Sequence, residues 1–318
     1  MTDQAGEAMT PLVKNAASRP PAASLRRRVR PQSRWWTVWL FLLPALLLFL
    51  YFKFIPMFAG IQMSFQKVRP FLGNEWVGWS NYAAVLNDSR FHDAIVHTLI
   101  LGFGQSIGAV IGGLVLALLL EGASKTLWFV RTAAFLPVVT ATAVIGEVWR
   151  IIYFPAPNGF LNSAIGSLGL DPVRWLEDPA VALYSVMAVG IWQGAPYNMV
   201  IFLAGLAGVD RSLYEASAID GAKLRHRLWY VTLPALRPAM TIVLVLAAVR
   251  SLRVFTDVWV LTGGGPAGAT DVWMTRIYSL GFERNQMGIA SAASILLLIA
   301  SIALTALALL ITRKRAEK

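Results

Sequence analysis

Six long apolar stretches constrain this chain more than any other feature of its sequence. Each is long enough to match the ~20 residues that a helix needs to cross a bilayer. A backbone exposed to lipid must satisfy its own hydrogen bonds, which favours helices as the spanning structure. Only 14% of the 318 residues are charged and 57% are hydrophobic. The sequence therefore predicts an all-α polytopic membrane protein with spans at about 35–57, 95–120, 127–154, 181–208, 235–262 and 286–312.

The distribution of Lys and Arg predicts how these spans are oriented. If both ends of the chain lie inside, 18 of the 28 basic residues fall in cytoplasmic segments and 6 in external ones. Basic residues accumulate on the cytoplasmic side of membrane spans. We therefore expect cytoplasmic N and C termini, and we attribute the net charge of +11 to membrane flanking rather than to nucleic-acid binding.

The two ends of the chain are predicted to be basic tails. Residues 1–34 are rich in Ala, Pro and Arg, and this composition favours a disordered cytoplasmic tail. A cleaved signal peptide is the alternative, but the apolar stretch that follows is longer than the ~7–15 residues typical of a signal peptide. Residues 313–318 form the second basic tail, and the six-span domain covers 35–312.

Gly104, Gly108 and Gly112 recur at intervals of four within the second predicted span. Residues four apart share one face of a helix, so these glycines make a flat stripe that another helix can approach closely. The stripe indicates helix packing rather than chemistry.

The hydrophilic segment between the fourth and fifth spans, residues 209–234, contains two predicted short helices. Ser212 and Glu215 fit a capping box, so the first helix should start at Leu213. Gly221 fits the left-handed position that ends a helix. A second helix should cover 222–232 and end at Pro234, which cannot continue the hydrogen-bond ladder. The segment is either an amphipathic hairpin linking two spans or a docking projection for a soluble partner.

This segment resembles the EAA motif of permeases from ABC importers. Glu215-Ala216-Ser217, Gly221 four residues later and Leu233-Pro234 stand at the spacing of that motif, with Ser217 in place of its second Ala. The resemblance implies that the helix pair docks on a separate ATP-binding subunit. The residues that it assigns to this coupling are Tyr214, Glu215, Ala216, Ser217, Asp220, Gly221, Ala222, Leu233 and Pro234.

Two further stretches resemble the carbohydrate branch of that family. They are VGWSNYAAVLNDSRF at 77–91 and LTGGGPAGAT at 261–270, and both are similar to the first permease of maltose and glycerol-3-phosphate systems. The resemblance implies a type I importer fold in a bacterial inner membrane. It also implies a second permease, two ATP-binding subunits and an extracytoplasmic solute-binding protein as partners, with ATP and Mg²⁺ held by the ATPase subunits and no cofactor in this chain.

Polar residues within the spans are candidates for a substrate pathway because an ionisable group in a membrane is costly. Arg250, Arg253 and Asp257 recur at i, i+3 and i+7 in the fifth span, so we expect them on one helical face, with Arg253 and Asp257 able to neutralise each other. The fourth span adds aromatic and amide side chains that suit a sugar or polyol. These are Trp192, Gln193, Tyr197 and Asn198, which can equally serve only in helix packing.

Other functions find less support in the sequence. There is no Cys and no metal-binding spacing of the three His, and we expect neither a bound metal nor an enzyme active site. An ion-coupled secondary transporter, an ABC permease for a non-carbohydrate solute and a structural membrane protein remain alternatives. The substrate itself, neutral or phosphorylated, is left open.

Overall fold

The computed structural model describes residues 35–69 and 71–316, so the tail predicted at 1–34 lies outside the described residues. The chain divides into two units between Lys53 and Phe54. The described part of the first unit is helical, with α1 (Trp35–Phe49) running into the π-helical turn η1 (Leu50–Phe54). Its apolar side chains are exposed, as expected for a helix surrounded by lipid or by other subunits.

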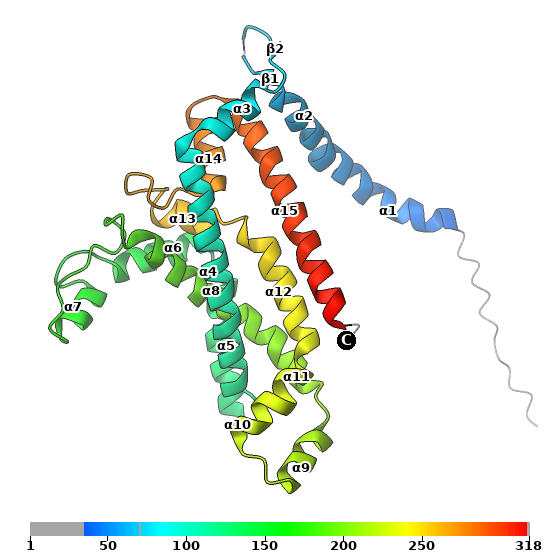
Figure 1. Ribbon diagram of the computed structural model, residues 1–318, viewed down its shortest axis with the longest axis vertical. Helices are drawn as coiled ribbons and strands as arrows, with labels where there is room; N and C mark the ends of the chain where they lie inside the picture. The colour runs from blue at the N-terminus through cyan, green and yellow to red at the C-terminus, as the bar shows by residue number, and fades with distance from the viewer. Residues whose placement is uncertain (1–34, 70, 317–318) are drawn as a thin grey trace, which may run out of the picture. The chain divides into compact units, whose positions relative to one another are not determined.

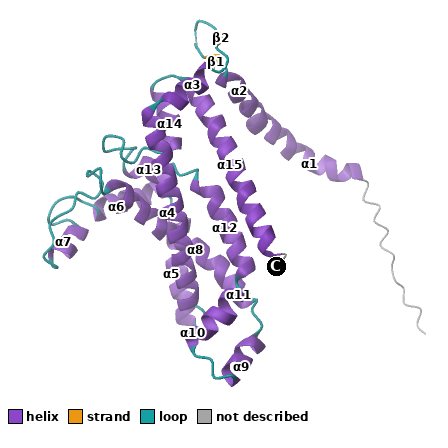
Figure 2. Cartoon of the chain, in the orientation of Figure 1, coloured by secondary structure: helices purple, strands orange, loops and turns teal. Residues whose placement is uncertain are grey.

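The second unit is built almost entirely of helices (Figures 1 and 2). It begins with α2 (Ile55–Ser64), and a two-stranded antiparallel hairpin follows, in which β1 (Gln66–Lys67) pairs with β2 (Glu75–Trp76). The remaining elements are α3 (Ser80–Asn87), α4 (Ser89–Leu119), α5 (Lys125–Val139), α6 (Thr142–Ile152), α7 (Phe160–Gly166), α8 (Ala182–Ala207), α9 (Arg211–Ile219), α10 (Leu224–Arg227), η2 (Leu228–Thr232), α11 (Leu233–Ala235), α12 (Arg237–Ser251), α13 (Thr256–Leu261), α14 (Trp273–Tyr278), η3 (Ser279–Glu283) and α15 (Met287–Ala316).

Four described helices are long and apolar enough to cross a membrane, and the number rises to six if two bent pairs each count as one span. The four are Val38–Ser64, Ser89–Leu119, Ala182–Ala207 and Met287–Leu310. The expected third span is bent by 102° between α5 and α6, at Thr140 and Ala141, whose backbones are extended. The second bent pair is Leu224–Ala235 with Arg237–Ser251, at 66°.

Helices α4 and α8 share the most extensive interface of the second unit, and the glycine stripe explains it. A Cβ added at Gly104 would lie 2.5 Å from Met187 Sδ, and one at Gly108 would lie 2.4 Å from Ile191 Cδ1. A Cβ added at Gly112 would lie 3.1 Å from Ala195 Cβ. All three contacts are on α8, so the predicted close helix packing is confirmed.

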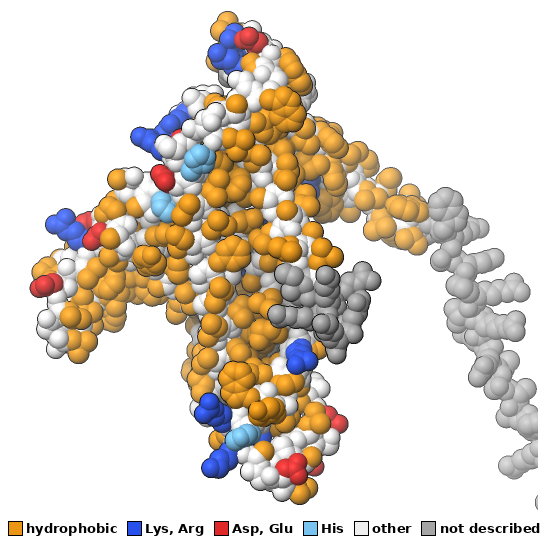
Figure 3. Space-filling model, in the orientation of Figure 1, with side chains coloured by type: hydrophobic (Ala, Val, Ile, Leu, Met, Phe, Trp, Pro, Cys, Tyr) orange, Lys and Arg blue, Asp and Glu red, His pale blue; other side chains and the backbone are white. Residues whose placement is uncertain are grey.

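Three buried clusters hold the helices of this unit together. One joins α4, α6, α8 and α13 through Leu101, Ile145, Val186, Val189 and Val258. The second joins α3, α4, α14 and α15, and the third joins α4, α8 and α12. Hydrophobic side chains cover most of the face shown in Figure 3. The charged side chains gather near the β hairpin, around α9 and α10 at the opposite end, and on the extension that carries α7.

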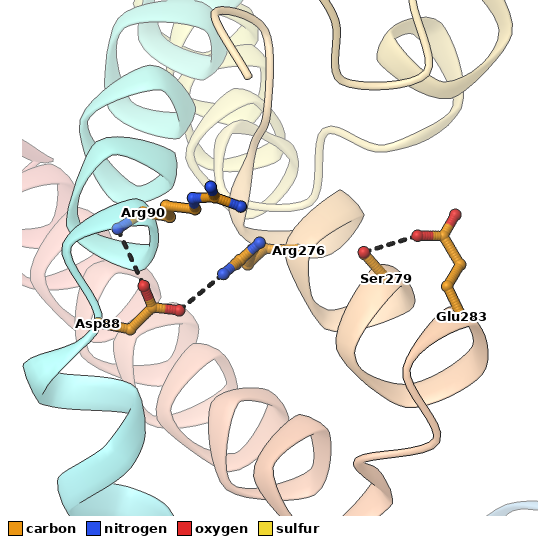
Figure 4. A network of polar contacts seen from close by, with 5 residues as sticks. All are labelled: Asp88, Arg90, Arg276, Ser279 and Glu283. Carbon is orange, nitrogen blue, oxygen red and sulfur yellow. Dashed lines mark hydrogen bonds and ion pairs between the residues drawn. The ribbon is translucent and has the colours of Figure 1, made fainter. Parts of the chain in front are cut away.

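A partly buried ion pair connects the start of α4 to α14 (Figure 4). Asp88 precedes α4 as its N-cap, and its Oδ1 accepts from the Arg90 N–H at 3.0 Å. Its Oδ2 accepts from Arg276 Nη2 at 2.7 Å, with the Arg276 side chain only 6% exposed. Burial alone would raise the pKa of Asp88, but the hydrogen bond and charge of Arg276, together with hydrogen bonds from the backbone N–H groups of Arg90 and Phe91, hold that pKa below its usual value.

Candidate functional site

Helix α9 starts at a cap different from the predicted one. Asp210, in extended conformation, is the N-cap, and its Oδ1 accepts from the Ser212 N–H at 2.9 Å. Hydrogen bonds from Ser212 hold the pKa of Asp210 below its usual value. The prediction that Ser212 caps a helix starting at Leu213 is therefore wrong: the carboxylate two residues earlier accepts from the Ser212 N–H and also suits the positive end of the helix dipole.

The C-terminal end of α9 confirms the predicted role of Gly221. This residue has φ of +70°, a conformation that only Gly adopts cheaply. The Ala222 N–H donates to Ser217 O at 2.9 Å, and the Gly221 N–H donates to Ala218 O at 3.1 Å. These two bonds are the Schellman pattern, so α9 ends in a defined turn and not in a frayed one.

The second helical part begins two residues later and ends three residues later than predicted, and it contains a π-helical turn. It runs as α10, η2 and α11, and Pro234 lies inside the first turn of α11 without ending it. Proline is tolerated there because a first-turn N–H needs no helical partner. The chain bends instead at the fully buried Leu236, so the prediction that Pro234 closes the helix is wrong.

The two helical parts are tied together at one side and exposed at the other. Tyr214 Oη lies 3.2 Å from Thr232 Oγ1, and Arg227 Nε donates to Ala222 O at 3.1 Å. Ser217, which stands where the motif has Ala, is buried and satisfies its hydroxyl on Tyr214 O at 2.8 Å. The opposite surface of α9 is open, with Glu215 exposed and Ile219 88% exposed. Helices α9 and α10 lie at the end of the unit far from the β hairpin (Figure 1).

A cavity of about 120 Å³ lies between α4, α8 and α12. Asn198 of α8 and Arg250 of α12 line it, together with Gln105 and Ser106 of α4. The Arg250 guanidinium carbon is 4.2 Å from the centre of the Tyr197 ring, a cation–π distance. The structure thus brings together three of the predicted pathway residues, Tyr197, Asn198 and Arg250.

The other predicted pathway residues are arranged differently from the expectation. Arg250, Arg253 and Asp257 do not share one helical face, because α12 ends at Ser251 and the chain turns before α13 begins at Thr256. Arg253 and Asp257 are not among the ion pairs of the described residues. Asp257 instead accepts a hydrogen bond from Gln105 Nε2 at 3.3 Å. The expected Arg253–Asp257 neutralisation is therefore wrong.

Gln193 and Trp192 point to different surroundings from Asn198. Gln193 and Asp257 line a much smaller space between α6, α8 and α13. Trp192 is 44% exposed and packs edge-on against Trp149 at 5.5 Å. Neither residue lines the cavity that holds Arg250.

Gln105 is a member of this site that the sequence reasoning missed. Its Nε2 donates to Asp257 and, at 3.4 Å, to Val186 O, so it bridges α4 to both α8 and α13. A Cβ at Gly190 would lie 1.7 Å from Gln105 Nε2, so only glycine leaves room for this amide. A polar amide beside the glycine stripe was the available signal, because an uncharged polar residue at a helix contact bonds across it.

Fold and site together define a multi-pass helical membrane protein with a helix–glycine–helix projection at one end and a polar cavity between its helices. This is the organisation of a transport permease. The chain belongs to the family described as binding-protein-dependent transport system inner membrane component, which matches residues 21–317. The sequence-based recognition of an ABC importer permease in the inner membrane is confirmed.

Named relatives are similar over nearly their whole length. A probable ABC transporter permease of Bacillus subtilis, YurN, is 33% identical over 84% of this chain and 92% of that protein. The trehalose/maltose permease MalF of Thermococcus litoralis is 32% identical over 88% and 94%. The sn-glycerol-3-phosphate permease UgpA of Agrobacterium fabrum is 31% identical over 87% and 94%.

A solved structure agrees with the sequence relatives. The crystal structure of a bacterial ABC transporter for import of the acidic polysaccharide alginate matches with a TM-score of 0.79 and 27% identity, covering 88% of this chain and 96% of that one. The same kind of transporter in complex with an alginate pentasaccharide-bound periplasmic protein matches with a TM-score of 0.78 and 26% identity, covering 88% and 95%.

Proposed function

We propose that this chain is the permease subunit of a binding-protein-dependent ABC importer for a sugar or a related polyol. The support is the family membership together with relatives whose names specify trehalose/maltose, arabinooligosaccharide and glycerol-3-phosphate transport. The chain forms the translocation path with a second permease and hydrolyses no ATP itself. ATP and Mg²⁺ are bound by two separate ATPase subunits, and an extracytoplasmic binding protein delivers the solute.

In this proposal α9 is the element through which ATP hydrolysis moves the spans. Its exposed face, with Glu215 and Ala216, contacts the ATPase subunit, and Ile219 adds an apolar contact. The Schellman turn at Gly221 and the Tyr214–Thr232 contact keep α9 fixed relative to η2. A rigid connection matters because a displacement of α9 is then passed to α12 and the cavity.

The orientation follows from the same proposal. Residues 209–234 and both termini lie in the cytoplasm, as the excess of Lys and Arg in those segments supports. The β hairpin and α3 then lie outside, on the side where the solute-binding protein arrives. The cavity lined by Asn198 and Arg250 belongs to the substrate path, and Tyr197 supports Arg250 there.

Replacing Glu215 by Lys tests the coupling role without disturbing the fold. Glu215 is exposed and forms no ion pair with any described residue, so the variant should fold and insert into the membrane normally. We expect solute uptake by proteoliposomes of the complete transporter to fall severalfold while ATP hydrolysis continues. Glu121→Lys is the matched control, an exposed charge reversal in the loop before α5. Full uptake by Glu215→Lys would overturn the assignment of α9 as the coupling element.

A further inference from the structure

Arg250 is a charge within the spans that the described part of the chain does not neutralise. The ion pairs among residues 35–69 and 71–316 join Arg69 to Glu75, Arg150 to Glu147 and Arg276 to Asp88, and none includes Arg250. A cation placed among membrane spans is costly and is retained where it pairs or serves a pathway. The side chain is exposed to the space at the α4–α8–α12 contact and not packed away from it.

Asp257 of α13 and Glu147 of α6 form no ion pair with Arg250. Asp257 receives the amide of Gln105 and lines the separate space with Gln193. Glu147 is held by Arg150 at 3.1 Å, and Arg150 also donates to Val260 O. Neither acid is thus poised to neutralise Arg250.

The surroundings of Arg250 leave its donors available. The guanidinium carbon lies 4.2 Å from the centre of the Tyr197 ring, a cation–π contact that needs no N–H donor, and the planar guanidinium presents its N–H groups as a fork. That fork matches the two oxygens of a carboxylate or a phosphate. Asn198 lines the same cavity and adds an amide that can bind a neighbouring hydroxyl.

We propose that the transported solute is an anionic saccharide or polyol, whose carboxylate or phosphate is received by Arg250. This inference rests on the proposed function and narrows its substrate class. The oxyanion forms a bidentate contact with the guanidinium, and Asn198 binds a hydroxyl next to it. Arg250 acts as the specificity-determining residue, because a neutral sugar leaves the cation uncompensated in the path.

Matched pairs of acidic and neutral probes test the proposal. The probes are radiolabelled galacturonate with galactose, glycerol 3-phosphate with glycerol, and an alginate trisaccharide with maltotriose. Binding is measured on the purified complex of both permeases and the ATPase subunits in nanodiscs, without the solute-binding protein. We expect at least one acidic probe to bind about tenfold or more tightly than its neutral partner, and Arg250→Gln to remove that preference.

A second arginine provides the control. Arg150→Gln removes a span arginine that Glu147 already neutralises, and we expect it to leave the acidic preference intact. Arg250→Lys should keep part of the preference, because it keeps the charge but loses the planar fork. A partial preference in Arg250→Lys and none in Arg250→Gln would show that the preference depends on a bidentate contact and not on positive charge alone.

Three outcomes would overturn the proposal. They are tighter binding of a neutral probe than of its acidic partner, failure of every acidic probe to bind, and an unchanged acidic preference in Arg250→Gln. A neutral sugar that is imported at full rate, with uptake still lost in Glu215→Lys, would refute the anionic class alone and leave the carbohydrate permease standing.

Discussion

The Asp88–Arg276 pair provides a stability prediction that can be worked from the geometry. Asp88 has two roles, since Oδ1 caps α4 through the Arg90 N–H and Oδ2 binds Arg276. Removing one partner of a buried ion pair costs about 3–5 kcal/mol, because it leaves the other charge buried and alone. Arg276 is 6% exposed and Asp88 is 29% exposed, so an unpaired Arg276 costs more stability than an unpaired Asp88.

The two roles of Asp88 separate in three variants. Asp88→Asn keeps the cap and an acceptor of the same shape, and we expect a loss of about 2–3 kcal/mol of unfolding free energy. Asp88→Ala also removes the cap and should lose about 1 kcal/mol more. Arg276→Met leaves only the partly hydrated Asp88 and should cost less than either, about 1 kcal/mol.

Reversible unfolding in mixed detergent and SDS micelles measures these losses. The double variant Asp88→Asn/Arg276→Met should be about as stable as Arg276→Met alone, because replacing Asp88 then leaves no arginine buried without a partner. Additive losses in the double variant would refute the ion-pair account, because they would show that the effect of Asp88→Asn does not depend on Arg276.

The pH dependence follows from the sign of the shift. The pKa of Asp88 in the folded protein lies below its usual value of about 4, which is expected in the unfolded chain. The contribution of Asp88 to the free energy of unfolding is therefore fully present above about pH 4 and is lost as the pH falls through the folded pKa. The stability gap between the natural protein and Asp88→Asn should therefore narrow below about pH 4. A gap that stays constant down to pH 2 would contradict this account.

Two other predictions concern the packing of the second unit. Gly102→Ala would place a Cβ 1.8 Å from Ser251 O and should destabilise the α4–α12 contact by about 1–3 kcal/mol in the same unfolding assay, whereas Gly60→Ala on α2, with nothing within 4 Å, should be neutral or stabilising. Equal losses in both would refute the close approach. Asn162 is 1% exposed, and its side chain accepts from Val173 N and Trp175 Nε1 and donates to the carbonyls of Pro155 and Val173. Asn162→Leu should therefore lower the free energy of unfolding by about 3 kcal/mol and speed proteolysis within 155–180. Unchanged cleavage would argue against this anchoring role.

The sequence was most informative where a residue type has a single structural explanation at its position. Gly221 was expected in a left-handed conformation, and its φ of +70° agrees. Gly104, Gly108 and Gly112 were expected to receive a neighbouring helix, and α8 packs against all three. Both inferences use the absence of a Cβ, which a sequence states directly.

The sequence was least informative where helices break. Spacing placed Arg253 and Asp257 one turn apart, but that inference needs a continuous helix, and the turn between Ser251 and Thr256 removes it. The 102° bend after Val139 was likewise not predicted, because Pro137, Thr140 and Thr142 around it are all tolerated within a continuous span. Gln105 and Asp257 are 152 residues apart, so only the fold joins them.

The local signals at helix ends were ambiguous for a related reason. Asp210 and Ser212 are both good N-cap residues, and the choice depends on where the preceding span ends. Pro234 is equally compatible with the end of a helix and with its first turn. Residues 313–316, predicted as part of a tail, continue α15, and the last two residues lie outside the described part.

Cross-linking of α9 to the ATPase subunit tests the central claim most directly. The chain contains no Cys, so Glu215→Cys introduces a single thiol on the exposed face of α9. In the assembled transporter, with a cysteine scanned along the ATPase surface, we predict a disulfide to one restricted patch, whose yield changes when ATP binds. Glu121→Cys, on the loop before α5, should form none at that patch. A Glu215→Cys thiol that stays free with every ATPase cysteine, or that reacts only with an impermeant reagent from outside the cell, would contradict the account.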